Sequence, residues 1–309
     1  MKKLCLVAMF ATIGMAFQSN ANAQETIFGL DDSNNIISIQ SSAPTVGTAV
    51  AISGLLAGDS LVGIDFRAGT GQMYAIGSAN NVYTLDLTTF GASLVGNFAD
   101  GVNDDPAGPG GLSGNQFAFD FNPAFTPDAS FNASGSFARI ISDTDTNRVI
   151  NGNTGEYLGG AKTDVFYPNS SADPNIQGIA YDNSVFGSTA TTQFGIDTNQ
   201  NTLVTIANNA GTLSTVGSLG NVFTGEVGFD ISGVTNTAFA SFETGVLGAS
   251  ELYTIDLGTG AVSTSLGSFG AGTNNIRSLA VVGAAVPEPG SASLLALGLA
   301  AFAGRRRRK

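Results

Sequence analysis

Four aspartates stand near the ends of four similar short runs of apolar and small residues. The four are Asp65, Asp120, Asp182 and Asp230. If the runs are equivalent strands of a repeat, the carboxylates meet near one axis, where they could hold calcium or include an acid and a base for glycoside hydrolysis. A catalytic pair needs two different environments, however, and a residue repeated in every unit more often accepts backbone hydrogen bonds. We therefore expect a structural role, with ion binding and catalysis as the alternatives.

A second group of oxygen-bearing side chains has the spacing that opens a calcium loop. Asp143, Asp145 and Asn147 alternate with threonines. The sixth position of such a loop should be glycine and the twelfth glutamate, but here they are Arg148 and Thr154. An Asx-rich hairpin turn is the better prediction, with a metal site as the weaker one.

Several classes of chemistry are excluded by composition. The chain has no histidine and no tryptophan, and its one cysteine, Cys5, lies in a segment that we expect to be removed. Without thiolate or imidazole there is no Ser-His dyad, haem attachment or zinc site of the usual kind. We expect a protein that is not an enzyme and needs no cofactor, calcium being the one alternative. The four arginines of the mature chain are expected in buried ion pairs.

The N-terminus has the pattern of a secretory signal peptide over residues 1–23. Lys2 and Lys3 precede an apolar run, and small residues stand at Ala21 and Ala23. The apolar run is shorter than the ~20 residues that a spanning helix needs. The sequence therefore predicts export, with cleavage after Ala23 and a mature domain over residues 24–284.

The C-terminus, residues 285–309, has three parts in a fixed order. Val286-Pro287-Glu288-Pro289 precedes an apolar stretch over 290–304, and a basic cluster follows. The cluster is Arg305, Arg306, Arg307, Arg308 and Lys309. The apolar stretch, if helical, would reach about 22 Å, short of a ~30 Å hydrocarbon core. It would be a weak, transient anchor in the inner membrane, with its basic end on the cytoplasmic side.

This tail resembles the PEP-CTERM sorting signal, in which Pro-Glu-Pro is followed by a short hydrophobic helix and an arginine cluster. The resemblance implies recognition by an exosortase-type membrane protease in a bacterium that exports exopolysaccharide. It also implies a membrane-anchored precursor that is then displayed at the cell surface or released. The alternative is a plain single-span tether behind a proline-rich linker.

The charge of the mature domain is strongly acidic. Seven of the 12 basic residues lie at the two ends, and removing both ends leaves five basic and 23 acidic residues. Such a surface repels nucleic acid and anionic lipid and suits divalent cations and neutral or cationic partners.

Between the two targeting segments the sequence repeats with a period near 50 residues, which is typical of propeller blades. Short alternating runs separated by Gly, Asn, Thr and Asp predict strands and tight turns. Four units of four strands are expected, and the second of them, which begins at Phe117 and forms the third blade, is less regular around Tyr157 to Phe166. The leftover run from Ile276 to Val282 reads as a first strand, and three runs before Ala51 read as strands two to four. Together they predict an all-β, five-bladed propeller closed by pairing of its N- and C-terminal strands.

Motifs throughout the domain resemble those of domain-of-unknown-function family 4394. They are Thr26-Ile27-Phe28-Gly29-Leu30, Gly63-Ile64-Asp65-Phe66-Arg67, Phe119-Asp120-Phe121-Asn122-Pro123, Arg139, Asn147-Arg148, Gly228-Phe229-Asp230-Ile231 and Ile276-Arg277-Ser278-Leu279-Ala280-Val281. The resemblance implies an exported, propeller-like domain and brings no established activity. It departs at Ala68, where the family usually has proline, and in the reduced turn after Val149.

These features favour a surface or matrix protein that is associated with exopolysaccharide. Its propeller would have a binding or structural role without catalysis. The alternative is a carboxylate-dependent enzyme, with or without the assistance of calcium, that acts on glycans or lactones. Fold alone does not decide between them, because propellers host hydrolases, lyases and binding modules.

Overall fold

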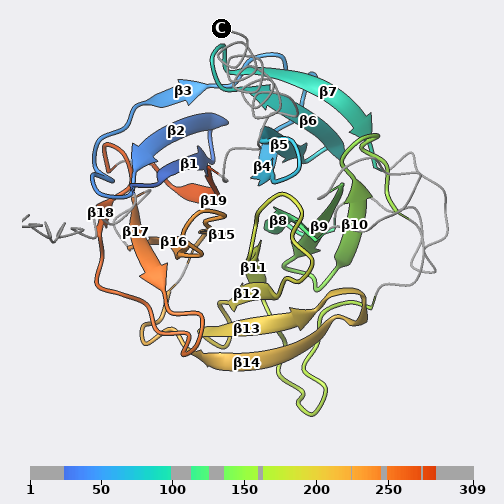
Figure 1. The fold of residues 1–309 in the computed structure, drawn as a ribbon, viewed down its shortest axis with the longest axis vertical. Helices are drawn as coiled ribbons and strands as arrows, with labels where there is room; N and C mark the ends of the chain where they lie inside the picture. Colours follow the sequence, from blue (N-terminus) through green and yellow to red (C-terminus); the bar gives the residue numbers. More distant parts are fainter. Residues whose placement is uncertain are drawn as a thin grey trace, which may run out of the picture.

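The computed structural model describes residues 24–98, 113–124, 136–158, 163–223, 225–244, 249–272 and 274–282. Five antiparallel sheets surround a common axis as the blades of a propeller (Figure 1). The described part contains a single helix, the short 3-10 turn Asn208–Ala210. The predicted all-β, five-bladed fold is confirmed.

Three blades each contain four consecutive strands. Blade 2 has β4 (Leu61–Arg67), β5 (Gln72–Gly77), β6 (Asn81–Asp86) and β7 (Gly91–Asn97). Blade 4 has β11 (Ile176–Tyr181), β12 (Gln193–Asp197), β13 (Thr202–Ala207) and β14 (Thr212–Ser218). Blade 5 has β15 (Val227–Ile231), β16 (Ala238–Glu243), β17 (Ser250–Ile255) and β18 (Gly267–Ser268).

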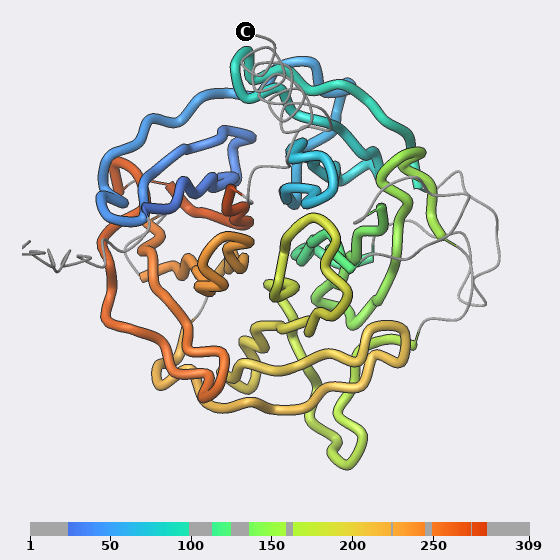
Figure 2. Tube along the Cα trace, in the orientation of Figure 1, coloured from blue at the N-terminus to red at the C-terminus, as the bar shows by residue number. Residues whose placement is uncertain are grey.

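Blade 1 is assembled from both ends of the domain. Its inner strand is β19 (Ile276–Val281), which pairs with β1 (Thr26–Asp31), followed by β2 (Asn35–Gln40) and β3 (Ala49–Ala51). Ile27 lies opposite Val281 and Phe28 opposite Ala280. The red strand therefore sits beside the blue ones in the chain trace (Figure 2). The predicted closure is confirmed, and it removes the sheet edges that an open array would expose.

Blade 3 departs from the prediction, because its sheet has three strands. These are β8 (Phe117–Phe121), β9 (Phe137–Ser142) and β10 (Asn147–Asn151). In the described part of the expected fourth strand, Tyr157 makes only an isolated bridge to Ile150. Further on, Phe166 pairs with Thr212 of blade 4. The segment leaves its own blade because its backbone finds hydrogen-bond partners on the neighbouring one.

The innermost strands are buried on both faces because each is packed between two other blades. All residues of β4, β8, β11 and β15 are buried. Aromatic pairs join adjacent blades across this layer. Phe28 and Phe66 lie 5.7 Å apart, and Tyr74 and Phe121 lie 4.9 Å apart, both edge to face. Such pairs contribute about 0.5–1.5 kcal/mol beyond the burial of their surface.

Asparagines in the hairpins help to fix where the next blade begins. Asn34 and Asn201 both adopt positive φ, 62° and 52°, a conformation that asparagine tolerates. The side-chain oxygen of Asn34 accepts the backbone N–H of Leu61 at 2.7 Å, and that of Asn201 accepts the N–H of Phe223 at 3.1 Å. The first of these bonds sets the start of β4 and hence the level of Asp65 on the axis.

The predicted signal peptide and sorting tail lie outside the described residues. Within the described residues no helix has the length and apolar character to cross a membrane.

Candidate functional site

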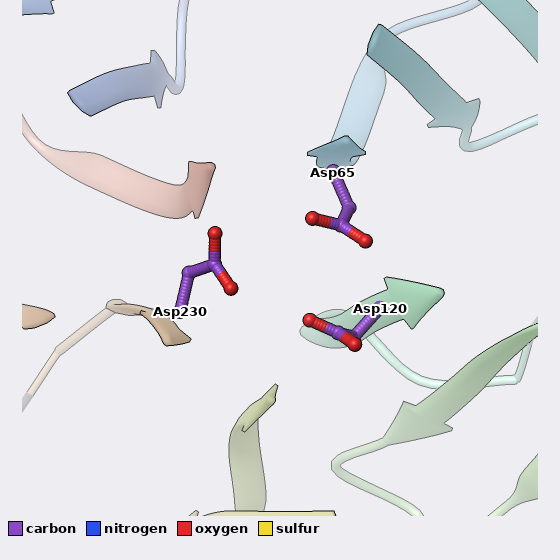
Figure 3. A group of neighbouring side chains, drawn as sticks. All are labelled: Asp65, Asp120 and Asp230. Carbon is purple, nitrogen blue, oxygen red and sulfur yellow. The ribbon is translucent and has the colours of Figure 1, made fainter. Parts of the chain in front are cut away.

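Three of the four predicted aspartates meet on the propeller axis. Asp65, Asp120 and Asp230 occupy equivalent positions of β4, β8 and β15, opposite Tyr74, Arg139 and Phe239 of the second strands. One carboxylate oxygen from each lies within 4.8 Å of the others. Figure 3 shows the three carboxylates turned toward one another across the centre of the ring. We call Asp65, Asp120 and Asp230 the axial triad.

Asp182 does not belong to this group, and its predicted alignment with the other three is wrong by two residues. In β11 the equivalent position is Ala180, opposite Phe194 of the second strand. Asp182 follows the end of β11, where its carboxylate accepts the N–H of Thr192 at 2.6 Å. The apolar run of blade 4 ends in the same residue type as the others, but its strand register places that residue beyond the axial layer. Ala280 occupies the equivalent position in β19, as expected.

The triad accepts hydrogen bonds from the backbone of all five inner strands. Asp65 accepts the N–H groups of Phe66, at 2.6 Å, and Phe121 of blade 3, at 2.7 Å. Asp120 accepts the N–H of Tyr181 in blade 4 at 3.3 Å.

Asp230 repeats the arrangement of Asp65. It accepts the N–H groups of Ile231, at 2.6 Å, and Val281 of blade 1, at 2.5 Å. Blades 4 and 1 have alanine at the axial level. The aspartate of the blade that follows each of them therefore also accepts the N–H of the next residue in its own strand. Three carboxylates thereby satisfy one N–H in each of the five blades, and three of these bonds join neighbouring blades.

Small residues two positions before the axial level let adjacent inner strands approach closely enough for these bonds. The five are Gly63, Ala118, Gly178, Gly228 and Ser278. A Cβ placed on Gly63 would lie 2.8 Å from the Cβ of Phe119, and one on Gly178 would lie 2.6 Å from the Cβ of Phe229. Ser278 uses its hydroxyl to accept the N–H of Ile64 at 3.0 Å.

Burial and mutual repulsion govern the ionisation of the triad. The side chains are 4–5% exposed. Burial, and then the charge of Asp230, raises the pKa of Asp65 well above its usual value, and burial with the charges of Asp65 and Asp230 does the same for the pKa of Asp120. Burial raises the pKa of Asp230 to about 7, against the lowering effect of its two backbone hydrogen bonds. The three carboxyl groups of the axial triad can therefore hold a proton or a cation on the axis.

The axis is narrow at the end from which the inner strands enter. Residues at equivalent positions of the five strands stand there, namely Val62, Phe117, Gln177, Val227 and Arg277. Arg277 pairs with Glu226 at 3.1 Å, and Asn275 donates to the same carboxylate at 3.3 Å. Gln177, Glu226 and Asn275 were not singled out from the sequence, and Arg277 was expected only to form an ion pair. The signal available was that Arg277 stands where the other inner strands carry apolar or neutral residues.

The weaker metal candidate does not assemble within the described residues. Asp143 accepts the N–H of Asn115 at 2.9 Å, and Asp145 lies in the left-handed region at φ 65°. Asn147 is fully buried, and its side-chain oxygen accepts Nη1 of Arg139 at 2.5 Å. In the described part of the chain, only the axial triad brings three potential ligand side chains within 4.8 Å.

The arginines follow the predicted ion pairing only in part. Arg277 pairs with Glu226, and Arg148 lies 3.7 Å from Asp164. Arg139 instead donates to neutral oxygens of Tyr181, Asn147, Asn208 and Asn209. Arg67 likewise donates to Asn153 and Ser136. Both are buried charges solvated by neutral groups, so residue type alone did not identify their partners.

Comparison with known proteins identifies the family to which the domain belongs. The sequence profile described as Domain of unknown function (DUF4394) matches residues 35–280. The chain belongs to the DUF4394 family. The PEP-CTERM protein-sorting motif matches residues 285–308, which marks an exported protein for exosortase-dependent processing. No curated protein matches this DUF4394 chain.

Solved structures resemble it loosely. A protein of unknown function from Bacteroides thetaiotaomicron is 13% identical with a TM-score of 0.45, over 84% of this chain and 65% of that one. Hydrazine synthase from Kuenenia stuttgartiensis is 15% identical with a TM-score of 0.38, over 69% of this chain. The match spans about half of the synthase chain, 52%.

Proposed function

We propose that this DUF4394 protein is a non-enzymatic module of the cell surface or extracellular matrix, sorted through an exosortase and associated with exopolysaccharide. The observation that carries the proposal is the state of the axial triad. All three carboxylates accept backbone N–H groups and are 4–5% exposed. A glycosidase needs two carboxylates that a sugar can reach, one kept protonated and the other ionised by unlike environments. The triad instead offers three carboxyl groups that are all enclosed.

A binding role is supported by a hollow between blades 1 and 5. Its volume is about 540 Å³. The lining is rich in hydroxyl groups and comprises Gln24, Glu25, Ser41, Ser42, Thr235, Thr237, Phe239, Thr254 and Leu266. Glu25 accepts the hydroxyls of Ser232 and Thr235, each at 2.8 Å, and so fastens the start of the domain to blade 5. We call this hollow the hydroxyl groove, and its chemistry suits the hydroxyl groups of a neutral glycan.

The C-terminal sorting motif supports the part of the proposal that concerns the location of the protein and its first partner. The sorting motif supports a membrane-anchored precursor that an exosortase-type protease cleaves, followed by display or release outside the cell. The acidic domain surface would repel nucleic acid and an anionic polysaccharide, which favours a neutral one.

The test combines binding with an activity screen on the exported protein. Isothermal titration with oligosaccharides from a neutral exopolysaccharide should show binding. Thr254→Val should weaken it several-fold, since a lost hydrogen bond costs about 0.5–1.5 kcal/mol. Thr84→Val is the matched control, because Thr84 has the same place in blade 2 that Thr254 has in blade 5, opposite the second strand.

The competing function would give a different result. Turnover of glycosides or lactones that Asp65→Asn or Asp230→Asn abolishes without loss of folding would overturn the proposal and favour the carboxylate-dependent enzyme.

A further inference from the structure

The axial triad concentrates negative charge where no basic side chain of the described residues compensates it. Arg67 and Arg139 donate to neutral oxygens elsewhere, and Arg277 is paired with Glu226. The remaining described arginine, Arg148, lies beside Asp164. Removing several carboxylates from water without a counter-charge is strongly unfavourable, so the site needs either protons or a cation.

A second observation concerns the hydrogen bonds of the three carboxylates. Both oxygens of Asp65 and both of Asp230 accept a backbone N–H. Asp120 uses only Oδ1, in a long 3.3 Å bond to the N–H of Tyr181, and no described residue donates to its Oδ2. Yet Asp120 is 4% exposed, and its carboxylate faces the other two (Figure 3). An oxygen without a protein donor, on a side chain that is 4% exposed and aimed into a cluster of carboxylates, is available to bind a cation.

We propose that Asp65, Asp120 and Asp230 bind one Ca²⁺ on the propeller axis. Three oxygens within 4.8 Å of one another can all lie about 2.8 Å or less from a common point, close to the ~2.3–2.6 Å of calcium–oxygen bonds. All three ligands are hard carboxylate oxygens, which favours Ca²⁺ or Mg²⁺ over transition metals. Ca²⁺ tolerates irregular geometry, whereas Mg²⁺ demands octahedral bonds of about 2.0–2.1 Å, and carboxylates held in place by backbone hydrogen bonds adapt more easily to the first ion than to the second.

An entry route follows the same axis. One small hollow is lined by Phe117, Gln177, Val227 and Arg277 at the mouth. A second shares these residues and reaches Phe119 and Phe229, each directly before a triad aspartate in the sequence. The small size of this hollow predicts slow exchange of the ion.

The ion would complete the inter-blade clamp. Each triad oxygen that accepts one N–H retains a further lone pair for the metal. Calcium would thus hold blades 2, 3 and 5 together through their carboxylates while these still bind the backbone of their neighbours. This role is independent of the hydroxyl groove, and a negative result here leaves the glycan proposal untouched.

The experiment measures calcium binding by the exported protein after treatment with EDTA and removal of the chelator. We expect one Ca²⁺ per chain by isothermal titration, with a dissociation constant near the ~10⁻⁴–10⁻³ M typical of extracellular modules, or tighter. Calcium at 100 times that constant should raise the melting temperature by about 5–10 °C. The same concentration of Mg²⁺ should raise it by much less.

Two matched variants locate the ion. Asp120→Asn keeps the oxygen that accepts the N–H of Tyr181 but loses a charge, so calcium affinity should fall at least tenfold while the protein still folds. Asp182→Asn, one blade away and outside the triad, should leave the response unchanged. If Asp120→Asn fails to fold, Asp230→Asn replaces it.

Three results would overturn the proposal. They are a wild-type protein that shows neither calcium binding nor a rise in melting temperature, an Asp120→Asn or Asp230→Asn variant with unchanged affinity, and equal loss of affinity in Asp182→Asn. The first would mean that protons alone neutralise the triad, and the others that calcium binds elsewhere on the acidic surface.

Discussion

The carboxylate of Asp65 in blade 2 accepts the backbone N–H of Phe121 in blade 3 at 2.7 Å. The bond connects the inner strands of two adjacent blades, which no sheet pairing joins. An equivalent bond connects Asp230 in blade 5 to Val281 in blade 1. These carboxylates therefore supply directional bonds between the inner strands of neighbouring blades, as does the hydroxyl of Ser278, which accepts the N–H of Ile64.

Close approach of the inner strands is a precondition of the clamp, and Gly63→Val tests it. A Cβ at this position would lie 2.8 Å from the Cβ of Phe119 and 3.1 Å from Ile76. Overpacking of this kind costs typically about 1–3 kcal/mol. Urea denaturation should show that loss for Gly63→Val. Gly91→Ala is the control, since its nearest contact is the flexible hydroxyl of Thr89 at 3.3 Å, and an equal loss there would contradict the explanation.

Asp145 should make stability depend on pH. Burial, and then the charges of Asp173, Asp164, Asp197 and Asp143, raises its pKa to about 6. Because the pKa of Asp145 is higher in the folded state than in the unfolded state, its protonated carboxyl contributes to the stability of the fold below about pH 4. This contribution to stability is lost as pH rises through 6. Asp145→Asn removes this loss, and asparagine accepts the left-handed backbone at this position.

Melting temperatures of the wild type and Asp145→Asn should therefore coincide near pH 4 and separate near pH 7.5, with the variant higher. Asp86→Asn is the control. The N–H groups of Thr89 and Thr88 lower the pKa of Asp86, so its removal should not raise the melting temperature at pH 7.5. A gap for Asp145→Asn that is the same at both pH values would refute the assignment.

Processing at the C-terminus is predicted by the sorting motif over residues 285–308. The mature protein should lack the basic cluster from Arg305 to Lys309. Intact-mass analysis of exported protein checks this. A mass that still includes the five basic residues would favour a plain membrane tether, and Glu288→Ala should then make no difference to export.

The sequence was sufficient for the ring and its closure because the repeat is carried by local patterns. The run from Ile276 has the same alternation as the other first strands. It is a first strand without partners at one end of the domain, and at the other end three strands lack a first strand, so the two sets complete one blade. The fourth strand of blade 3 was mispredicted because the partner of Phe166 lies on another blade, at Thr212, which local periodicity does not encode.

The site was predictable in composition but not in register. Asp65, Asp120 and Asp230 were identified because they end apolar runs, whereas Asp182 satisfies the same pattern and lies two residues too far along its strand. A period of two decides the orientation of a strand residue, but only pairing with the second strand sets its level on the axis. Most neutral partners of Arg67 and Arg139, such as Asn153 and Asn209, were equally beyond reach because they are distant in sequence.

The claim that the axial carboxylates fasten the blades is tested most directly by the free energy of unfolding of Asp65→Ala, Asp230→Ala and Asp182→Ala. Urea denaturation at pH 5 in EDTA is suitable, since protonation then weakens the repulsion within the triad. Asp65→Ala and Asp230→Ala each leave two buried N–H groups without an acceptor and should lose at least about 1–3 kcal/mol. Asp182→Ala, whose one bond is to the exposed N–H of Thr192, should lose less than about 1 kcal/mol. If the two triad variants unfold with the wild-type free energy, or if Asp182→Ala loses as much as they do, the carboxylates do not hold the ring together.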